Sequence, residues 1–261
     1  MTDLRSSDGT RLALHDFGGA GEPVLLLPGL CGYAGEWAAT IAFLRSNFHV
    51  YALDPRGHGD SETRPADVSR EAHVADTTAA LHTIGPAVVI GQSMGGHTGF
   101  LTAAGHPELV TRLIVAESSP QGVGEDSVKS VDGWLAGWPV PFPDLAAAAE
   151  FLGGGLVGQA WAGGLDQRGD GWHPRFERDV MVATLAAMVE PRWAEFAAVT
   201  CPTLVVKGGN SEMATAEYER MRKHPIVSAV EIPGAGHDVH LDSPDPWRST
   251  VTKFVTSTLH S

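Results

Sequence analysis

A serine that could act as a nucleophile lies in the segment Gly91-Gln92-Ser93-Met94-Gly95. The segment follows the short apolar run 87–90 and precedes residues 94–104, whose spacing is helical. Glycines two positions before and after the serine suit a tight strand–turn–helix connection, where side chains at those positions would collide. Such a turn exposes the hydroxyl and directs the N-terminus of the following helix toward a developing oxyanion. The segment therefore predicts that Ser93 is a nucleophile for acyl transfer.

The elements that would hold this serine follow from alternating short apolar runs and longer stretches of helical spacing. The expected strands are residues 24–27, 48–53, 87–90, 113–116, 203–206 and 227–232, and the expected helices include residues 69–84, 94–104 and 247–259. Ser69 is the expected N-cap of the first of these helices. Short runs that are apolar on both faces and separated by helices are typical of parallel strands covered on both sides. The pattern predicts an α/β fold with a doubly wound, mostly parallel sheet.

One segment departs from this alternation. Residues 119–195 show no expected strand, and they carry five of the seven Trp residues, namely Trp134, Trp138, Trp161, Trp172 and Trp193. A stretch of this length is too long for an ordinary loop. We expect a helical cap, residues 119–195, inserted into a core domain formed by residues 1–118 and 196–261.

The composition limits the partners of the chain. It has 18 Lys and Arg against 31 Asp and Glu, a formal net charge of −13 with its 12 His neutral, whereas nucleic acids and anionic membranes select basic surfaces. No apolar run reaches the roughly 18 residues that span a bilayer, and the first residues are too polar for a signal peptide. Two cysteines, Cys31 and Cys201, make neither a disulfide framework nor a structural zinc site. We expect a cytoplasmic protein with no nucleic-acid, membrane, metal or cofactor partner, and leave a homodimer open.

Four ordered blocks make nearly the whole chain resemble the α/β-hydrolase family. They are Leu27-Pro28-Gly29-Leu30-Cys31-Gly32, Asp54-Pro55-Arg56-Gly57-His58-Gly59-Asp60-Ser61, Gly91-Gln92-Ser93-Met94-Gly95 and Gly234-Ala235-Gly236-His237. The resemblance implies the α/β-hydrolase fold and a triad in the order serine, acid, histidine. It points to His237 as the base that takes the proton of Ser93. His240 is the nearest rival, whereas His58 and His97 are expected to be structural.

The acid of the triad is the point at which the sequence departs from the family pattern. Most members carry an aspartate after the strand that corresponds to residues 203–206, but here that loop reads Lys207-Gly208-Gly209-Asn210-Ser211-Glu212. Two glutamates are candidates, Glu212 in this loop and Glu117 directly after the strand 113–116. Some branches of the family, among them a subgroup of haloalkane dehalogenases, certain small bacterial esterases and zearalenone-type lactonases, hold the acid after that earlier strand. We favour Glu117, because Glu212 also suits the N-terminus of a following helix.

The resemblance also assigns the groups that would contact the substrate. The oxyanion hole is expected from the backbone N–H of Met94 and that of Leu30, with Cys31 as the alternative. Trp138 is expected in the substrate pocket, and the wider candidates in the cap are Trp134, Phe142, Phe151, Trp161, Met181 and Met188. We expect at least half of these cap residues to pack in the core of the cap itself.

Serine chemistry in this fold predicts hydrolysis of a small-molecule carboxylic ester or lactone through an acyl-enzyme. A moderately hydrophobic, uncharged substrate suits the apolar cap. Carbon–carbon bond hydrolysis and perhydrolase activity use the same groups and stay open as alternatives. So does a catalytically slow ligand-binding receptor, which the intact pair of Ser93 and His237 disfavours.

Overall fold

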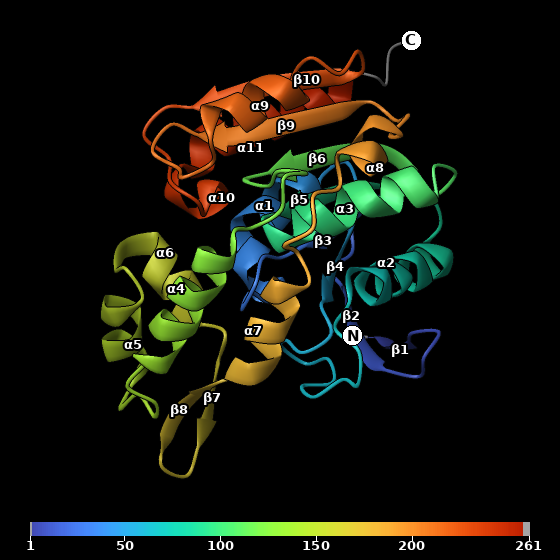
Figure 1. Ribbon diagram of the computed structural model, residues 1–261. Helices are drawn as coiled ribbons and strands as arrows, with labels where there is room; N and C mark the ends of the chain where they lie inside the picture. The colour runs from blue at the N-terminus through green and yellow to red at the C-terminus, as the bar shows by residue number, and fades with distance from the viewer. Residues whose placement is uncertain (1, 258–261) are drawn as a thin grey trace.

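The computed structural model describes residues 2–257 and centres on an eight-stranded sheet (Figure 1). Its strands are β1 (Thr2–Arg5), β2 (Arg11–Asp16), β3 (Pro23–Leu27), β4 (His49–Asp54), β5 (Ala87–Gln92), β6 (Val110–Ala116), β9 (Thr203–Gly208) and β10 (Val227–Ile232). They lie in the order β1-β2-β4-β3-β5-β6-β9-β10. From β4 to β10 all neighbours are parallel, whereas β1 and β2 form an antiparallel edge that the apolar pattern did not indicate. The sheet is thus mostly parallel, as the sequence predicted.

Helices cover both faces of this sheet. They are η1 (Ala34–Trp37), a 3-10 helix, and α1 (Ala38–Leu44), α2 (Arg70–Ile84), α3 (Met94–Gly105), α8 (Trp193–Ala197), α9 (Thr215–Met221), α10 (Val239–Asp242) and α11 (Pro244–Ser257). On one face α2, α3, α8 and α9 pack on Val89 and its neighbours; on the other, η1, α1, α10 and α11 pack on Val88 and Ile90. Because both faces are buried, β5 is apolar at successive positions rather than at alternate ones.

The inserted segment, residues 119–195, gathers to one side of the sheet between β6 and β9 (Figure 1). It contains the helices α4 (Glu125–Ala136), α5 (Leu145–Phe151), α6 (Gly155–Ala162) and α7 (Arg178–Ala186). It also contains an antiparallel hairpin of β7 (Leu165–Arg168) and β8 (Gly171–Pro174). The expectation that this segment holds no strand was therefore wrong. The hairpin strands have only four residues each and are largely exposed or half-buried, so they lack the apolar run by which the buried strands were recognised.

Within residues 2–257, none of the helices combines the length and the apolar character that a bilayer crossing requires.

Candidate active site

Ser93 stands at the sharp turn between β5 and α3. Its φ of 51° lies in the left-handed region, where a residue with a side chain is strained. A Cβ at Gly91 would meet the backbone of Gly95, and one at Gly95 would meet the carbonyls of Leu27 and Pro28. The turn thus has no room for side chains at its two glycines, which is the reason for the Gly-x-Ser-x-Gly spacing.

Glu117 lies directly beyond β6, and its carboxylate is the one that the structure brings to His237. The distance from Glu117 Oε2 to His237 Nδ1 is 3.4 Å. The other carboxylate oxygen accepts a hydrogen bond from the backbone N–H of Gly208, the last residue of β9. Glu117 also has a left-handed φ of 53°, and its side chain is almost fully buried. The carboxylate therefore starts from the end of β6 but is anchored at the end of β9, where the family places its usual aspartate.

His237 follows β10 in a turn and is open to the cavity, with 58% of its side chain exposed. The surrounding protein disfavours the charged form of the ring, but the adjacent Glu117 carboxylate and the negative charges of Asp238 and Glu212 outweigh this effect and raise the pKa of His237 above its usual value. A carboxylate at Nδ1 also sets the tautomer in which Nε2 is free to accept a proton. His237 thus has the surroundings of a base whose protonated form is stabilised.

The loop after β3 passes directly over the serine. A Cβ at Gly29 would lie 3.4 Å from Cβ of Ser93 and would also meet the side chain of Gln92. Leu30 and Cys31 line the cavity, and Cys31 takes a φ of 65°. The side chain of Met94 is buried with Leu185 and Met188 and does not line the cavity. The expected contact of Met94 with the substrate would therefore involve only its backbone N–H.

Ser93, Glu117 and His237 line one cavity of about 520 Å³. The inserted segment forms part of its wall through Val123, Val131, Trp134, Trp161, Leu185 and Met188. The cavity lies within the size range of small-molecule sites. Segments far apart in the chain therefore meet around the serine.

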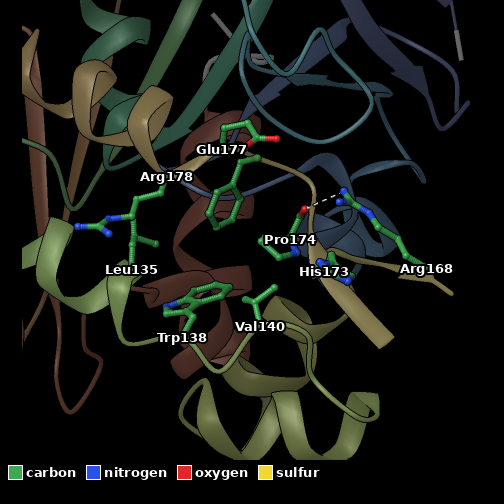
Figure 2. A pocket seen from close by; sticks show the side chains of 9 residues that line it. Leu135, Trp138, Val140, Arg168, His173, Pro174, Glu177 and Arg178 are labelled. Atoms are coloured by element: carbon green, nitrogen blue, oxygen red, sulfur yellow. Dashed lines mark hydrogen bonds between the residues drawn. The ribbon is translucent and has the colours of Figure 1, made fainter. Parts of the chain in front are cut away.

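Trp138, which the sequence placed in the substrate pocket, does not line the cavity that holds Ser93. It is 8% exposed, packs against Phe142 and Phe176, and lines a separate cavity of about 220 Å³ within the inserted segment (Figure 2). Phe142, Phe151 and Met181 also lie outside the lining of the serine cavity. The inserted segment has its own aromatic core, and the sequence alone did not separate core from pocket.

The other histidines near the motifs are enclosed. His240 is 1% exposed, stacks on Trp37 at a ring-centroid distance of 4.2 Å, and burial lowers its pKa to about 3. Burial lowers the pKa of His58 to about 4, and its Nδ1 lies 2.9 Å from the carbonyl of Arg56. His97 is fully buried in α3. Neither His240 nor His97 lines the serine cavity.

The family of the chain follows from comparison with known proteins. A family model described as "Alpha/beta hydrolase family" matches residues 24–249. The chain belongs to the alpha/beta hydrolase family.

The relatives of this alpha/beta hydrolase include several named hydrolases. The sn-1-specific diacylglycerol lipase ABHD11 of Mus musculus is 31% identical over 81% of this chain and 73% of its own length. The 2-(acetamidomethylene)succinate hydrolase of Mesorhizobium japonicum is 24% identical over 91% of this chain and 89% of its own length. Among solved structures, an E-2-(acetamidomethylene)succinate hydrolase superposes with a TM-score of 0.88 and 22% identity, over 97% of this chain and 98% of the other. The enol-lactonase from Burkholderia xenovorans LB400 superposes with a TM-score of 0.79 and 22% identity, over 95% of this chain and 98% of its own chain.

Two residues at the hydrolase site were not singled out by the sequence, although each adjoins one that was. Gln92, directly before Ser93, donates a hydrogen bond of 2.9 Å to the backbone carbonyl of His237. Asp238, directly after His237, accepts a hydrogen bond of 3.0 Å from the indole N–H of Trp161 in α6. Gln92 therefore ties the serine turn to the histidine turn, and Asp238 ties the histidine turn to the inserted segment. The sequence signal that could have identified them is their position next to Ser93 and His237.

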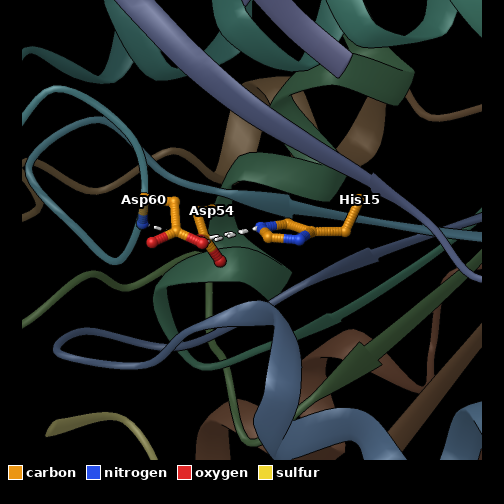
Figure 3. A group of neighbouring side chains, drawn as sticks. All are labelled: His15, Asp54 and Asp60. Carbon is orange, nitrogen blue, oxygen red and sulfur yellow. Dashed lines mark hydrogen bonds and ion pairs between the residues drawn. The ribbon is translucent and has the colours of Figure 1, made fainter. Parts of the chain in front are cut away.

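The buried Asp54 and the half-buried His15 and Asp60 form a cluster outside the lining of the serine cavity (Figure 3). His15 Nε2 lies 3.1 Å from Asp54 Oδ2. The oxygens of Asp54 accept the backbone N–H groups of Ala34 and Asp60, at 2.6 and 2.8 Å, and Arg175 pairs with Asp60 at 2.7 Å. Protein donors thus already occupy these carboxylates. We interpret the cluster as a link between β2, the loop after β4 and the inserted segment.

Proposed function

We propose that this alpha/beta hydrolase is a serine hydrolase that cleaves a carboxylic ester or lactone of a small, moderately hydrophobic substrate. The observation that carries the proposal is the shared cavity, whose lining includes a strained serine and a histidine paired with a buried glutamate. Nucleophile, base and orienting carboxylate are the three parts that acyl transfer by a serine requires. The named relatives support a hydrolase, and the enol-lactonase among the structural neighbours is consistent with the same fold serving lactones.

The proposed reaction has two halves. Ser93 Oγ adds to the acyl carbon while His237 takes the hydroxyl proton, and the carbonyl electron pair moves to the oxygen. The backbone N–H groups of Leu30 and Met94 are the proposed donors to that oxyanion. When the intermediate collapses, the alkoxide leaves with the proton from His237 and the acyl group stays on Ser93. Water then repeats the sequence, giving its proton to His237 and releasing the acid. In a lactone the alkoxide remains tethered to the acyl group.

We further infer that the inserted segment acts as a cap on this site. Trp134, Trp161, Leu185 and Met188 give the cavity an apolar wall. A wall of this kind favours apolar acyl or alkoxy groups through the burial of their surface.

Active-site labelling tests the proposal. A fluorophosphonate probe should label the wild-type protein and fail to label Ser93→Ala, and His237→Gln should lose the labelling and the hydrolysis of p-nitrophenyl esters. His82→Gln, which changes an exposed histidine of α2, is the matched control and should behave as wild type. A panel of esters and lactones then ranks the substrates. A protein that fails to label and hydrolyses none of them would instead be a ligand-binding receptor.

A further inference from the structure

The charges around the serine cavity all have one sign apart from His237. Its lining includes the carboxylates of Glu117, Glu212, Glu217 and Asp238, and no Lys or Arg among the described residues. This bias exceeds that of the chain as a whole, which has 18 basic side chains to 31 acidic ones. The cavity therefore presents a negative environment to whatever enters it.

Two of these carboxylates are already engaged by the protein. Glu117 is held by the N–H of Gly208 and by His237, and Asp238 accepts the indole N–H of Trp161. Their roles in orienting the histidine turn account for their presence.

The other two carboxylates have no protein partner within residues 2–257. Glu212 is exposed in the loop after β9, and Glu217 is half-buried in the first turn of α9; neither forms a side-chain hydrogen bond or an ion pair there. A first-turn glutamate interacts favourably with the helix dipole, which explains one of them in part. It does not explain why both unpaired carboxylates face the cavity that holds Ser93.

The remainder of the wall strengthens the effect of these charges. Leu30, Leu185 and Met188 are apolar, and Coulomb interactions are stronger beside a surface of low polarizability than in open water. Trp134 and Trp161 add aromatic rings to the wall, and the faces of such rings attract cations. The lining disfavours an anion and tolerates or attracts a cation.

We propose that Glu212 and Glu217 make this site select substrates by charge, so that it takes neutral or positively charged esters and rejects those bearing a carboxylate. The proposal rests on the proposed serine hydrolase function and specifies its substrate class. It also distinguishes this chain from the Mesorhizobium japonicum relative, which is named for a succinate. The lining described here has no Lys or Arg side chain to pair with the carboxylates of a succinate.

Three p-nitrophenyl esters of similar shape test the proposal. The acyl groups are 5-(trimethylammonio)pentanoate, its neutral isostere 6,6-dimethylheptanoate, and hemiadipate, which carries a carboxylate. At low ionic strength we expect kcat/KM for the hemiadipate to be at least about 100-fold below that for the cationic ester, roughly tenfold for each unpaired carboxylate. Salt at 0.5 M should narrow the difference through screening.

Variants assign the effect to the two glutamates. The double variant Glu212→Gln/Glu217→Gln should reduce the cation-to-anion ratio of kcat/KM at least tenfold, and a circular dichroism spectrum and melting temperature like those of the wild type show that it folds. Glu219→Gln is the matched control, because Glu219 lies on the same helix but pairs with Arg222 and does not line the cavity. Hydrolysis of the hemiadipate within threefold of the neutral ester, or an unchanged ratio in the double variant, would overturn the proposal.

A binding measurement separates this proposal from the proposed function. In Ser93→Ala, the fluorescence of Trp134 and Trp161 should report hexyltrimethylammonium binding at least tenfold more tightly than heptanoate. If the wild-type protein hydrolyses no ester, the proposed function fails, and this binding preference still decides the charge selectivity. Equal or reversed affinities would contradict the charge selectivity even in an active hydrolase.

Discussion

Glu117 shows how one residue can take over a role from a different strand. Its Cα stands at the end of β6, yet its carboxylate bonds to Gly208 at the end of β9 and lies 3.4 Å from His237. The neighbouring strands β6 and β9 run parallel, so a longer side chain from one can reach the position that an aspartate from the other would fill. Glu212 lines the same cavity without forming such a pair.

Exchanging each glutamate for glutamine tests this assignment. Glu117→Gln should lower kcat by about 10²- to 10⁴-fold, because the imidazole loses the carboxylate that orients it and stabilises its protonated form. Since Glu117 helps to raise the pKa of His237, the residual activity should also extend to lower pH, as the base stays neutral there. The pH profile of kcat/KM for a neutral ester measures both effects.

Glu212→Gln is the matched control for that experiment. The Glu212 carboxylate has a smaller effect on the pKa of His237 than Glu117 does. In this variant kcat should stay within about twofold of the wild type, and the acidic limb of the pH profile of kcat/KM should move only slightly. Near wild-type turnover in Glu117→Gln with loss of activity in Glu212→Gln would reverse the assignment.

The turn between β5 and α3 shows how an element depends on the absence of side chains. Gly95 packs against the carbonyls of Leu27 and Pro28, so the start of α3 lies directly on the end of β3. Gly105, the last residue of the same helix, has open space where a Cβ would stand. Gly95 and Gly105, two of the glycines of α3, thus have different reasons for being glycine.

Alanine at these two positions should have opposite effects. Gly95→Ala forces a methyl group into rigid backbone, which should lower the free energy of unfolding by at least about 2 kcal/mol and displace Ser93 enough to reduce kcat. Gly105→Ala should change stability by less than about 1 kcal/mol, in the stabilising direction, because alanine favours the helix. Urea unfolding and ester hydrolysis measure both, and a stable, fully active Gly95→Ala would contradict the packing argument.

At the scale of the whole molecule, four buried histidines connect stability to pH. Burial lowers the pKa of His58 to about 4 and that of His240 to about 3, and it lowers the pKa of His73 and His97 well below the usual value. The unfolded chain therefore binds more protons at these sites below about pH 6.5, and stability is lost as the pH falls. Glu36, Asp76 and Asp238, whose pKa values burial raises, act in the opposite sense.

His97→Phe tests this linkage at one site. Both ring nitrogens of His97 are buried without a hydrogen-bond partner, and the ring packs edge-on against Phe100. Phenylalanine should therefore be tolerated at pH 7.5. Between pH 6.5 and 4.5 the free energy of unfolding of the variant should fall less steeply than that of the wild type, and the two slopes should differ by at most about 1.4 kcal/mol per pH unit. Thermal or urea unfolding across this range measures the slope. A slope equal to that of the wild type would mean that folding does not lower the pKa of His97.

The sequence by itself determined the architecture that short-range patterns encode. Runs apolar on both faces marked the parallel strands from β3 to β10, and Ser69 caps α2 by accepting the N–H of Ala72. It also marked the serine turn, because a turn that tight excludes side chains at two fixed positions. The strands β7 and β8 of the hairpin were not predicted, since short strands with little burial leave no periodic apolar signal.

Only the tertiary structure decided which residues meet around Ser93. Glu117 and Glu212 are both glutamates near a strand end, and their separation from His237 depends on strand order and on how each side chain is anchored, which no local pattern contains. In the same way Trp134 and Trp161 face the cavity whereas Trp138 packs inside the inserted segment, although all three are tryptophans in one helical region. Burial against a neighbour and exposure to a cavity are properties of the packed chain, so an apolar residue type is compatible with either.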